Sequence, residues 1–263
     1  MWEFLLSADA IMALLTLTFL EIILGIDNIV FISLAANKLP EGKRSRVTNI
    51  GLFLAMFQRI VLLFFVSFLI GLKKPFYIME YTWVHIEFSW QAVILFVGGL
   101  FLIYKSTSEM QEKIKEPEHD EANVKSKKIN TVSQAIIQIL IIDFIFSVDS
   151  ILTAVGMTNG LHPNHNYALI LMIIAVVISI IIMITFANPI RKFIDSHLSI
   201  QILAFAFLIL IGFMLITEAA HLSHTAIFDQ TVGAIPKGYL YFAIAFSLFV
   251  EFLNYKATKK KKG

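Results

Sequence analysis

The sequence contains no cysteine, and only 15% of its 263 residues are charged. Without cysteine the chain can form neither disulfides nor thiolate metal sites, and it lacks the usual soft ligands for Cu(I). It carries no nucleotide-hydrolysis motif, and no His-Glu-x-x-His or Ser-His arrangement falls within an apolar segment. We therefore expect neither an enzyme nor an ATP-driven pump, and we expect no tightly bound cofactor and no nucleic-acid partner.

The sequence consists largely of long hydrophobic segments. Hydrophobic residues make up 58% of the chain, far above the share in soluble proteins. Stretches of about 20 mostly apolar residues, enough to cross a hydrocarbon core of ~30 Å, recur along the whole length. Hydropathy predicts seven membrane spans, at residues 10–36, 50–71, 90–105, 133–157, 167–188, 199–217 and 239–254. The expected fold class is an all-α polytopic membrane protein.

The positive charges are distributed unevenly between the two sides of these spans. Of the 21 Lys and Arg residues, 17 fall in the segments that follow the odd-numbered spans, Arg59 lies inside the second span, and the other side carries Lys73, Lys74 and Lys237. Because positive charges favour the cytoplasmic side, this places the N-terminus outside the cell and the C-terminus in the cytoplasm.

Two similar halves are joined by a charged segment. Residues 109–130 are rich in Glu and Lys and contain Pro117, which is typical of a solvated linker. The predicted organisation is a first three-helix repeat at 1–108, this cytoplasmic linker at 109–130, a second three-helix repeat at 131–222, and a seventh helix with a basic cytoplasmic tail at 223–263.

The repeat is carried by matched acidic motifs in the first and fourth spans. Both read acid, five residues, Asp, small polar side chain, Ile, as Glu21 to Asp27-Asn28-Ile and as Asp143 to Asp149-Ser150-Ile. A second match relates the segment from Gly99 in the third span to the segment from Gly212 in the sixth. Since the first and fourth spans are predicted to run in opposite directions, the two triplets of helices form a 3+3 inverted repeat, a common way to build a transport site near the bilayer midplane.

The spacing of six residues bears on how these acids can act together. On a straight α-helix it separates the two carboxylates of one motif by ~120° around the axis and ~9 Å along it. Convergence on one site therefore predicts local breaks in the first helix near Gly25 to Asn28 and in the fourth near Ser147 to Ser150. The alternative is that each acid makes a separate structural hydrogen bond with a neighbouring helix.

Oxygen ligands of this kind suit hard divalent cations such as Mn²⁺, Ca²⁺ or Mg²⁺. The candidate ligands are Glu21, Asp27, Asn28, Asp143, Asp149 and Ser150. Thr16 and Gln138 occupy matched positions one or two turns earlier and are supporting candidates. Four carboxylates around one dication leave excess negative charge, which calls for a second cation, a proton or a basic partner.

Arg59 is the candidate basic partner, because it lies too deep in the second span to reach water easily. We expect it to pair with Asp27, the acid predicted to be nearest the cytoplasmic side. It acts either as a functional counter-ion to the acids or as a structural bridge.

Five of the seven histidines are predicted on the outer side: His85, His162, His165, His221 and His224. Two pairs among them are spaced by three residues, which could form a loose metal-capture site on a helical turn. Solvated loop histidines are the simpler interpretation.

The motifs from Glu21 to Phe31 and from Asp143 to Gly156 resemble those of the TerC family of bacterial membrane proteins, and most of all its short YgdQ-like branch. The segments from Gly98 to Lys105 and from Pro236 to Phe242 extend the likeness to nearly the whole chain. The resemblance implies a multi-pass protein of the bacterial inner membrane related to the LysE transporter superfamily, with members linked to manganese efflux and, by name, to tellurium-compound resistance. Glu218 and Glu251 also fall at positions familiar from the family.

The preferred functional hypothesis is a secondary transporter that exports Mn²⁺ or a similar hard dication, with protons as counter-substrate, because closely spaced acids can exchange a dication for protons. Its expected partners are membrane lipids, divalent cations, protons and other membrane proteins, including a second copy of the chain. The alternative is a membrane scaffold or assembly partner in metal or tellurium-compound stress resistance, without transport of its own.

Overall fold

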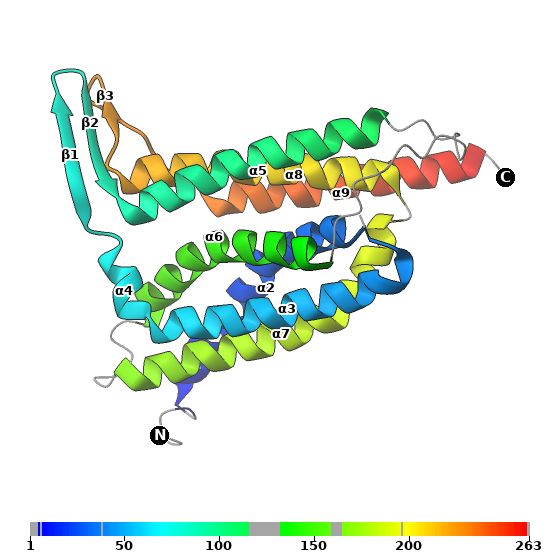
Figure 1. Cartoon of the computed structure of the whole chain (residues 1–263), viewed down its shortest axis with the longest axis horizontal. Helices are drawn as coiled ribbons and strands as arrows, with labels where there is room; N and C mark the ends of the chain where they lie inside the picture. Colours follow the sequence, from blue (N-terminus) through cyan, green and yellow to red (C-terminus); the bar gives the residue numbers. More distant parts are fainter. Residues whose placement is uncertain are drawn as a thin grey trace. The chain divides into compact units, whose positions relative to one another are not determined.

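The computed structural model describes residues 5, 7–37, 39–115, 132–158, 165–195 and 197–261, leaving out some side chains, mainly in the first and last helices. The chain is mostly helical (Figure 1). Its helices are α2 (Ala8–Asn37), α3 (Glu41–Phe64), α4 (Val66–Gly71), α5 (Trp90–Lys115), α6 (Val132–Thr158), α7 (His165–Asp195), α8 (Leu198–Leu222) and α9 (Lys237–Lys261). Every predicted span coincides with helix, the second being divided at Phe65 between α3 and α4.

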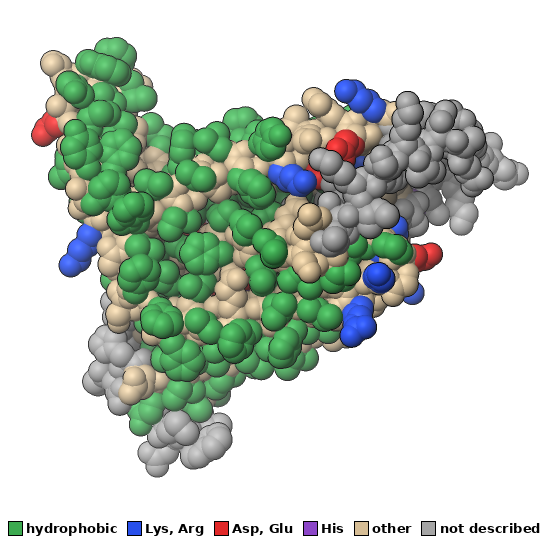
Figure 2. All heavy atoms as spheres, in the orientation of Figure 1, with side chains coloured by type: hydrophobic (Ala, Val, Ile, Leu, Met, Phe, Trp, Pro, Cys, Tyr) green, Lys and Arg blue, Asp and Glu red, His purple; other side chains and the backbone are tan. Residues whose placement is uncertain are grey.

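Among the described residues, five helices are long and apolar enough to cross a membrane, namely α3, α5, α6, α7 and α8. Helices suit this setting because each backbone N–H and C=O is bonded within its own segment, where lipid offers no partner. Figure 2 shows hydrophobic side chains covering the helix flanks. The all-α polytopic membrane class is confirmed, while the total of seven spans stays a prediction.

The structure divides into two compact units, and the first contains α2, α3, α4, α6 and α7. Within it α2 packs mainly on α7, and α3 packs on both α6 and α7. Glycines allow close approach: a Cβ built at Gly51 of α3 would lie 3.0 Å from Ile139 of α6. These packed helices position the buried charges described below.

The second unit contains α5, α8 and α9. Helices α5 and α8 run antiparallel and cross at two glycines. A Cβ built at Gly99 would lie 2.6 Å from the Gly212 carbonyl oxygen, and one built at Gly212 would lie 2.8 Å from the Gly99 carbonyl oxygen. The flanking contacts are reciprocal as well, since Gly99 faces Ile216 while Gly212 faces Ile103.

The second unit also holds a small antiparallel sheet that the hydropathy analysis did not predict. Its strands are β1 (Pro75–Tyr81), β2 (Val84–Ser89), β3 (Ala226–Ile227) and β4 (Gln230–Thr231), in the order β1-β2-β3-β4. The sequence does contain the signal, because apolar and polar residues alternate from Val84 to Phe88. The segment is too short and too polar to register as a membrane span.

The main helix pairs are the first predicted span with the fifth (α2 with α7), the second with both the fourth and the fifth (α3 with α6 and α7), and the third with the sixth (α5 with α8). If the first span is exchanged with the fourth, the second with the fifth and the third with the sixth, the same set of pairs results. An inverted repeat would produce that pattern, and the repeat itself remains a prediction. Of the predicted linker, residues 109–115 extend α5, and residues 116–130 lie outside the described part.

Candidate functional site

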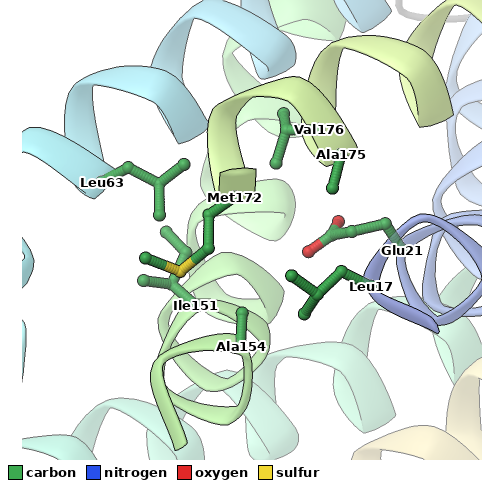
Figure 3. A pocket seen from close by; sticks show the side chains of 8 residues that line it. All are labelled: Leu17, Glu21, Leu63, Ile151, Ala154, Met172, Ala175 and Val176. Atoms are coloured by element: carbon green, nitrogen blue, oxygen red, sulfur yellow. The ribbon is translucent and has the colours of Figure 1, made fainter. Parts of the chain in front are cut away.

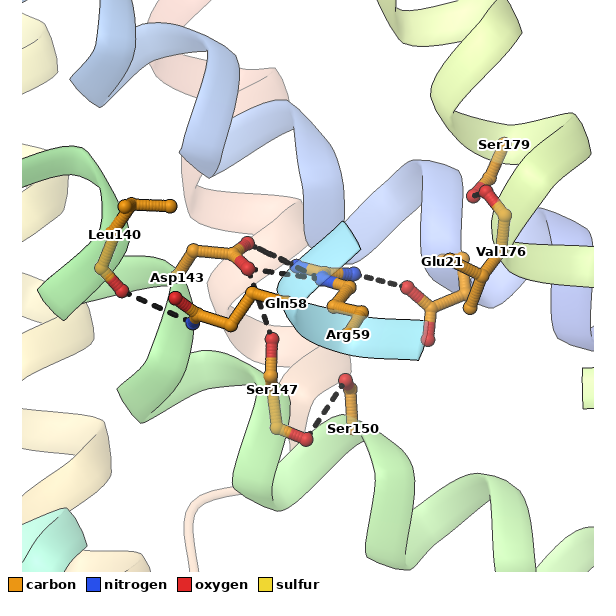
Figure 4. Close-up of polar contacts among 9 residues, drawn as sticks. All are labelled: Glu21, Gln58, Arg59, Leu140, Asp143, Ser147, Ser150, Val176 and Ser179. Carbon is orange, nitrogen blue, oxygen red and sulfur yellow. Dashed lines mark hydrogen bonds and ion pairs between the residues drawn. The ribbon is translucent and has the colours of Figure 1, made fainter. Parts of the chain in front are cut away.

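The first unit contains a buried cluster of three charged side chains centred on Arg59, which is only 1% exposed. Its Nη2 donates to Asp143 Oδ1 at 2.7 Å, and its Nε donates to the same oxygen at 3.2 Å. Its Nη1 donates to Glu21. Figure 4 shows the guanidinium lying between the two carboxylates, which are themselves buried.

Three helices contribute to this charged cluster: α2 carries Glu21, α3 carries Arg59 and α6 carries Asp143. Glu21 and Asp143 are the leading acids of the two matched motifs, so the fold brings equivalent positions of the predicted repeat onto one cation. The planar guanidinium suits this role, because its fixed fork of donors can engage two carboxylates at once. With all three groups ionised, the formal charge of the cluster is one negative.

Further hydrogen bonds hold the α6 side of the cluster in place. Ser147 Oγ donates to Asp143 Oδ2 at 3.1 Å, and Ser150 Oγ donates to the Ser147 carbonyl at 3.4 Å. A bond between two helices adds to these: Gln58 Nε2 of α3 donates to the Leu140 carbonyl of α6 at 3.2 Å. The parts played by Gln58 and Ser147 are visible only in the fold, because the sequence does not show which helices are neighbours.

A small cavity of about 10 Å³ lies beside Glu21 (Figure 3). That is room for about one water molecule. Among the described residues that line it, Glu21 is charged and the others are apolar: Leu17, Leu63, Ile151, Ala154, Met172, Ala175 and Val176. The cavity therefore leaves space next to a buried carboxylate that already bonds Arg59.

The predicted helix breaks are wrong: α2 is continuous through Gly25 and Asn28, and α6 is continuous through Ser147 and Ser150. Gly25 serves close packing instead, because a Cβ at this position would clash with Met183 Sδ of α7. The two serine hydroxyls bond groups of α6 itself, as described above, so they do not open the helix. Acids six residues apart on these helices therefore diverge, and convergence occurs between the motifs rather than within each.

The expected partner of Arg59 was Asp27, and the partners found are Glu21 and Asp143. The side chains of Asp27 and Asn28 lie outside the described ones, so their place in a metal site stays a prediction. Asp149 is described as half-buried on α6. Within the described residues no group of three or more Asp, Glu or His is arranged to hold a metal ion.

The supporting residues predicted from sequence are scattered. Thr16 is exposed and donates to the Met12 carbonyl of its own helix at 2.7 Å. Gln138 is half-buried on α6, a little more than one turn before Asp143. Glu218 on α8 and Glu251 on α9 belong to the second unit, whereas the Arg59 cluster belongs to the first.

Two of the outer histidines meet a carboxylate that the sequence analysis did not single out. Glu87 of β2 lies between them, with Oε2 3.1 Å from His224 Nδ1 and Oε1 3.5 Å from His85 Nε2. His221 is exposed near the end of α8. The predicted pair of His162 and His165 lies outside the described side chains.

The long apolar helices and a charged cluster buried among them define an integral membrane protein with a polar centre. The chain belongs to the integral membrane protein TerC family, whose model matches residues 6–262. It is 39% identical over 262 residues to a UPF0053 protein of Haemophilus influenzae, covering 100% of both chains. It is 40% identical over 260 residues to the UPF0053 inner membrane protein YgdQ of Escherichia coli strain K12, covering 99% of this chain and 98% of that one.

A longer relative shares only this part. The UPF0053 inner membrane protein YoaE of Escherichia coli strain K12 is 37% identical over 253 residues, which is 96% of this chain but 44% of YoaE. No solved structure matches the chain. Family membership and a membrane location are thereby established.

Proposed function

We propose that this chain is a secondary transporter that exports a hard divalent cation, with Mn²⁺ as the favoured cargo and Ca²⁺ as the alternative. The observation that supports the proposal most is the meeting of Glu21 and Asp143 at one buried cation, Arg59. A charge at the centre of a membrane helix costs about 2.5–3.5 kcal/mol on insertion scales, so a protein that only needed packing would place apolar residues here.

In this proposal Arg59 acts as an internal substitute for the cargo. An arriving dication competes with the guanidinium for the same carboxylate oxygens. The dication can balance the whole formal charge of the acid pair, whereas the guanidinium balances half of it. Buried carboxylates left without any partner would cost several kcal/mol, so exchange of one cation for the other is easier than leaving the pair empty. Asp27, Asn28, Asp149 and Ser150 are proposed to extend this ligand set along α2 and α6.

Proton coupling follows from the same carboxylates. When a dication leaves, the acids retain excess negative charge, and taking up a proton relieves it. The proposal therefore has a cation leaving as protons enter, in an inverted repeat with the N-terminus outside and the C-terminus in the cytoplasm. A second copy of the chain is a proposed partner.

The second candidate function is a membrane scaffold whose buried charges only hold α2, α3 and α6 together. The full set of hydrogen bonds around Arg59 favours it, because a satisfied ion cluster needs no cargo. The two candidates differ in whether the folded chain binds a divalent cation.

Metal-dependent thermal stabilisation of the purified protein tests the proposal. A ligand that binds only the folded state at 100 times its dissociation constant stabilises it by about 2.7 kcal/mol. We expect Mn²⁺ to raise the unfolding temperature of the native chain, and we expect Asp27→Asn and Asp149→Asn each to remove that shift. His221→Ala is the control and should keep the shift, because this histidine is exposed and belongs to the second unit. An equal response to metal in both aspartate variants and the native chain would reject these ligands.

A further inference from the structure

The β1–β2 hairpin has two chemically different faces. Antiparallel register places Tyr77 opposite Phe88, Met79 opposite Ile86, and Tyr81 opposite Val84. Residues directly opposite share a face of the sheet, and alternate residues share it along each strand. These six apolar side chains therefore form one face, which we name the tyrosine face.

The opposite face of the hairpin is mostly polar. Register places Ile78 opposite Glu87 and Glu80 opposite His85, and His224 contacts Glu87 on this side. The tyrosine face is only partly covered by the rest of the described chain, since Tyr77 is 59% exposed and Tyr81 is 63% exposed. In water such a surface would be unfavourable, because each exposed aromatic ring leaves apolar area hydrated.

The hairpin is tied to the end of a helix that can cross a membrane. Strand β2 ends at Ser89 and α5 begins at Trp90, whose ring stacks on Phe76 of β1 at a centroid distance of 4.9 Å. Figure 1 shows both strands running steeply across the direction of α5. Figure 2 shows hydrophobic side chains on the hairpin on the same side as the hydrophobic flank of α5. In a bilayer that α5 crosses along its axis, both strands would lie along the surface at the end where α5 begins.

A second aromatic feature lies beside the end of the hairpin. Phe228, in the turn between β3 and β4, is 74% exposed and has a positive φ of 49°, which is unusual for a bulky residue. Its N–H donates to the Trp83 carbonyl at 2.9 Å, and Trp83 is 56% exposed. Exposed Trp and Tyr side chains are typical of the boundary between membrane and water, where the apolar ring contacts lipid and the polar N–H or O–H group bonds water.

We propose that the tyrosine face docks in the interfacial layer of the bilayer leaflet at which α5 begins, while the face with Glu80 and Glu87 stays in water. The occupant is lipid because the face lies at the end of a helix that is long and apolar enough to cross a membrane, and because its exposed side chains, Tyr77 and Tyr81, are of a type that suits the boundary between membrane and water. The hairpin thereby anchors the end of α5 at a fixed depth. This role is independent of the cargo and would hold for a transporter or a scaffold.

The native absence of cysteine makes a paired labelling experiment direct. Tyr81→Cys and Glu80→Cys place a spin label on adjacent, exposed residues of opposite faces, and Tyr77→Cys with Ile78→Cys repeats the comparison. The full-length protein is reconstituted in phosphatidylcholine and phosphatidylglycerol vesicles, and collision rates with oxygen and with a water-soluble nickel chelate are measured by electron paramagnetic resonance. Each variant is first required to match the native far-ultraviolet circular dichroism and unfolding temperature.

Labels at 77 and 81 are expected to show a severalfold higher ratio of oxygen to nickel collisions than labels at 78 and 80, because oxygen concentrates in lipid and the chelate is excluded. Equal, high nickel collision rates on both faces would mean that the hairpin stands in water, and would overturn the proposal. Labels at 77 and 81 that are shielded from both reagents would mean that protein, such as a second copy, covers the face, and would overturn it as well.

Discussion

Replacing Arg59 with methionine is expected to destabilise the folded chain by about 3–5 kcal/mol at neutral pH, because it leaves two buried carboxylates without their shared cation. Glu21 and Asp143 both bond Arg59 and are only 3% and 4% exposed, so bulk water does not reach them. Carboxylates in such a place relieve the cost by taking up protons. The difference in unfolding temperature between the native chain and Arg59→Met should therefore shrink as the pH falls.

Neutralising the acids supplies the control for Arg59→Met. In the triple variant Arg59→Met, Glu21→Gln, Asp143→Asn the cluster carries no charge, and most of the lost stability should return, because no uncompensated charge is left buried there. Full native stability of Arg59→Met at neutral pH would contradict the importance of the cluster.

The single variant Arg59→Met also distinguishes the two possible roles of Arg59, functional counter-ion and structural bridge. If the guanidinium is a counter-ion, its removal keeps an acid protonated to higher pH, and the pH midpoint of metal binding moves upward. If it is a structural bridge, stability falls but the midpoint stays where it is.

Gly99→Leu is expected to prevent normal packing of α5 on α8. The first atom of the new side chain would lie 2.6 Å from the Gly212 carbonyl oxygen and 2.8 Å from Ile216 Cγ1. A carbonyl of the backbone cannot rotate away as a side chain can, so the helices must separate. Overpacking typically lowers the free energy of unfolding by about 1–3 kcal/mol, and we expect Gly99→Leu to reach or exceed the upper end of that range. The loss is measured as a fall in unfolding temperature.

Gly156→Leu is the matched control, a glycine in α6 around which no described atom lies within 4 Å of a built Cβ. It should unfold near the native temperature. Equal stability of both leucine variants would show that the glycine crossing is not a tight contact.

The helices could be predicted from sequence because lipid imposes a simple rule: a backbone that crosses it must be helical and apolar for about 20 residues. The same rule directed attention to Arg59 and to the matched acids, which are unusual inside apolar segments. Hydropathy over long apolar runs does not predict the β1–β2 hairpin, because the signal of a strand is alternation over a few residues such as Val84 to Phe88.

The sequence alone does not show which helices pack against one another. Depth along the helix was the basis for expecting Asp27 as the partner of Arg59. The described contacts of Arg59 are with Glu21 and Asp143, on two helices, α2 and α6, that both pack against α3. The predicted helix breaks were wrong for a related reason. Gly25 was interpreted as a weak point in one helix, and its use is to admit Met183 from another.

Cation flux through the purified chain tests the central claim most directly. The protein is reconstituted in vesicles that contain a fluorescent indicator for Mn²⁺, and entry of Mn²⁺ is followed with and without a pH gradient, beside the triple variant Arg59→Met, Glu21→Gln, Asp143→Asn. The account predicts saturable Mn²⁺ flux that responds to the pH gradient and is lost in the triple variant. Flux no greater than in protein-free vesicles for Mn²⁺ and Ca²⁺ alike, or undiminished flux without the two buried carboxylates, would contradict it.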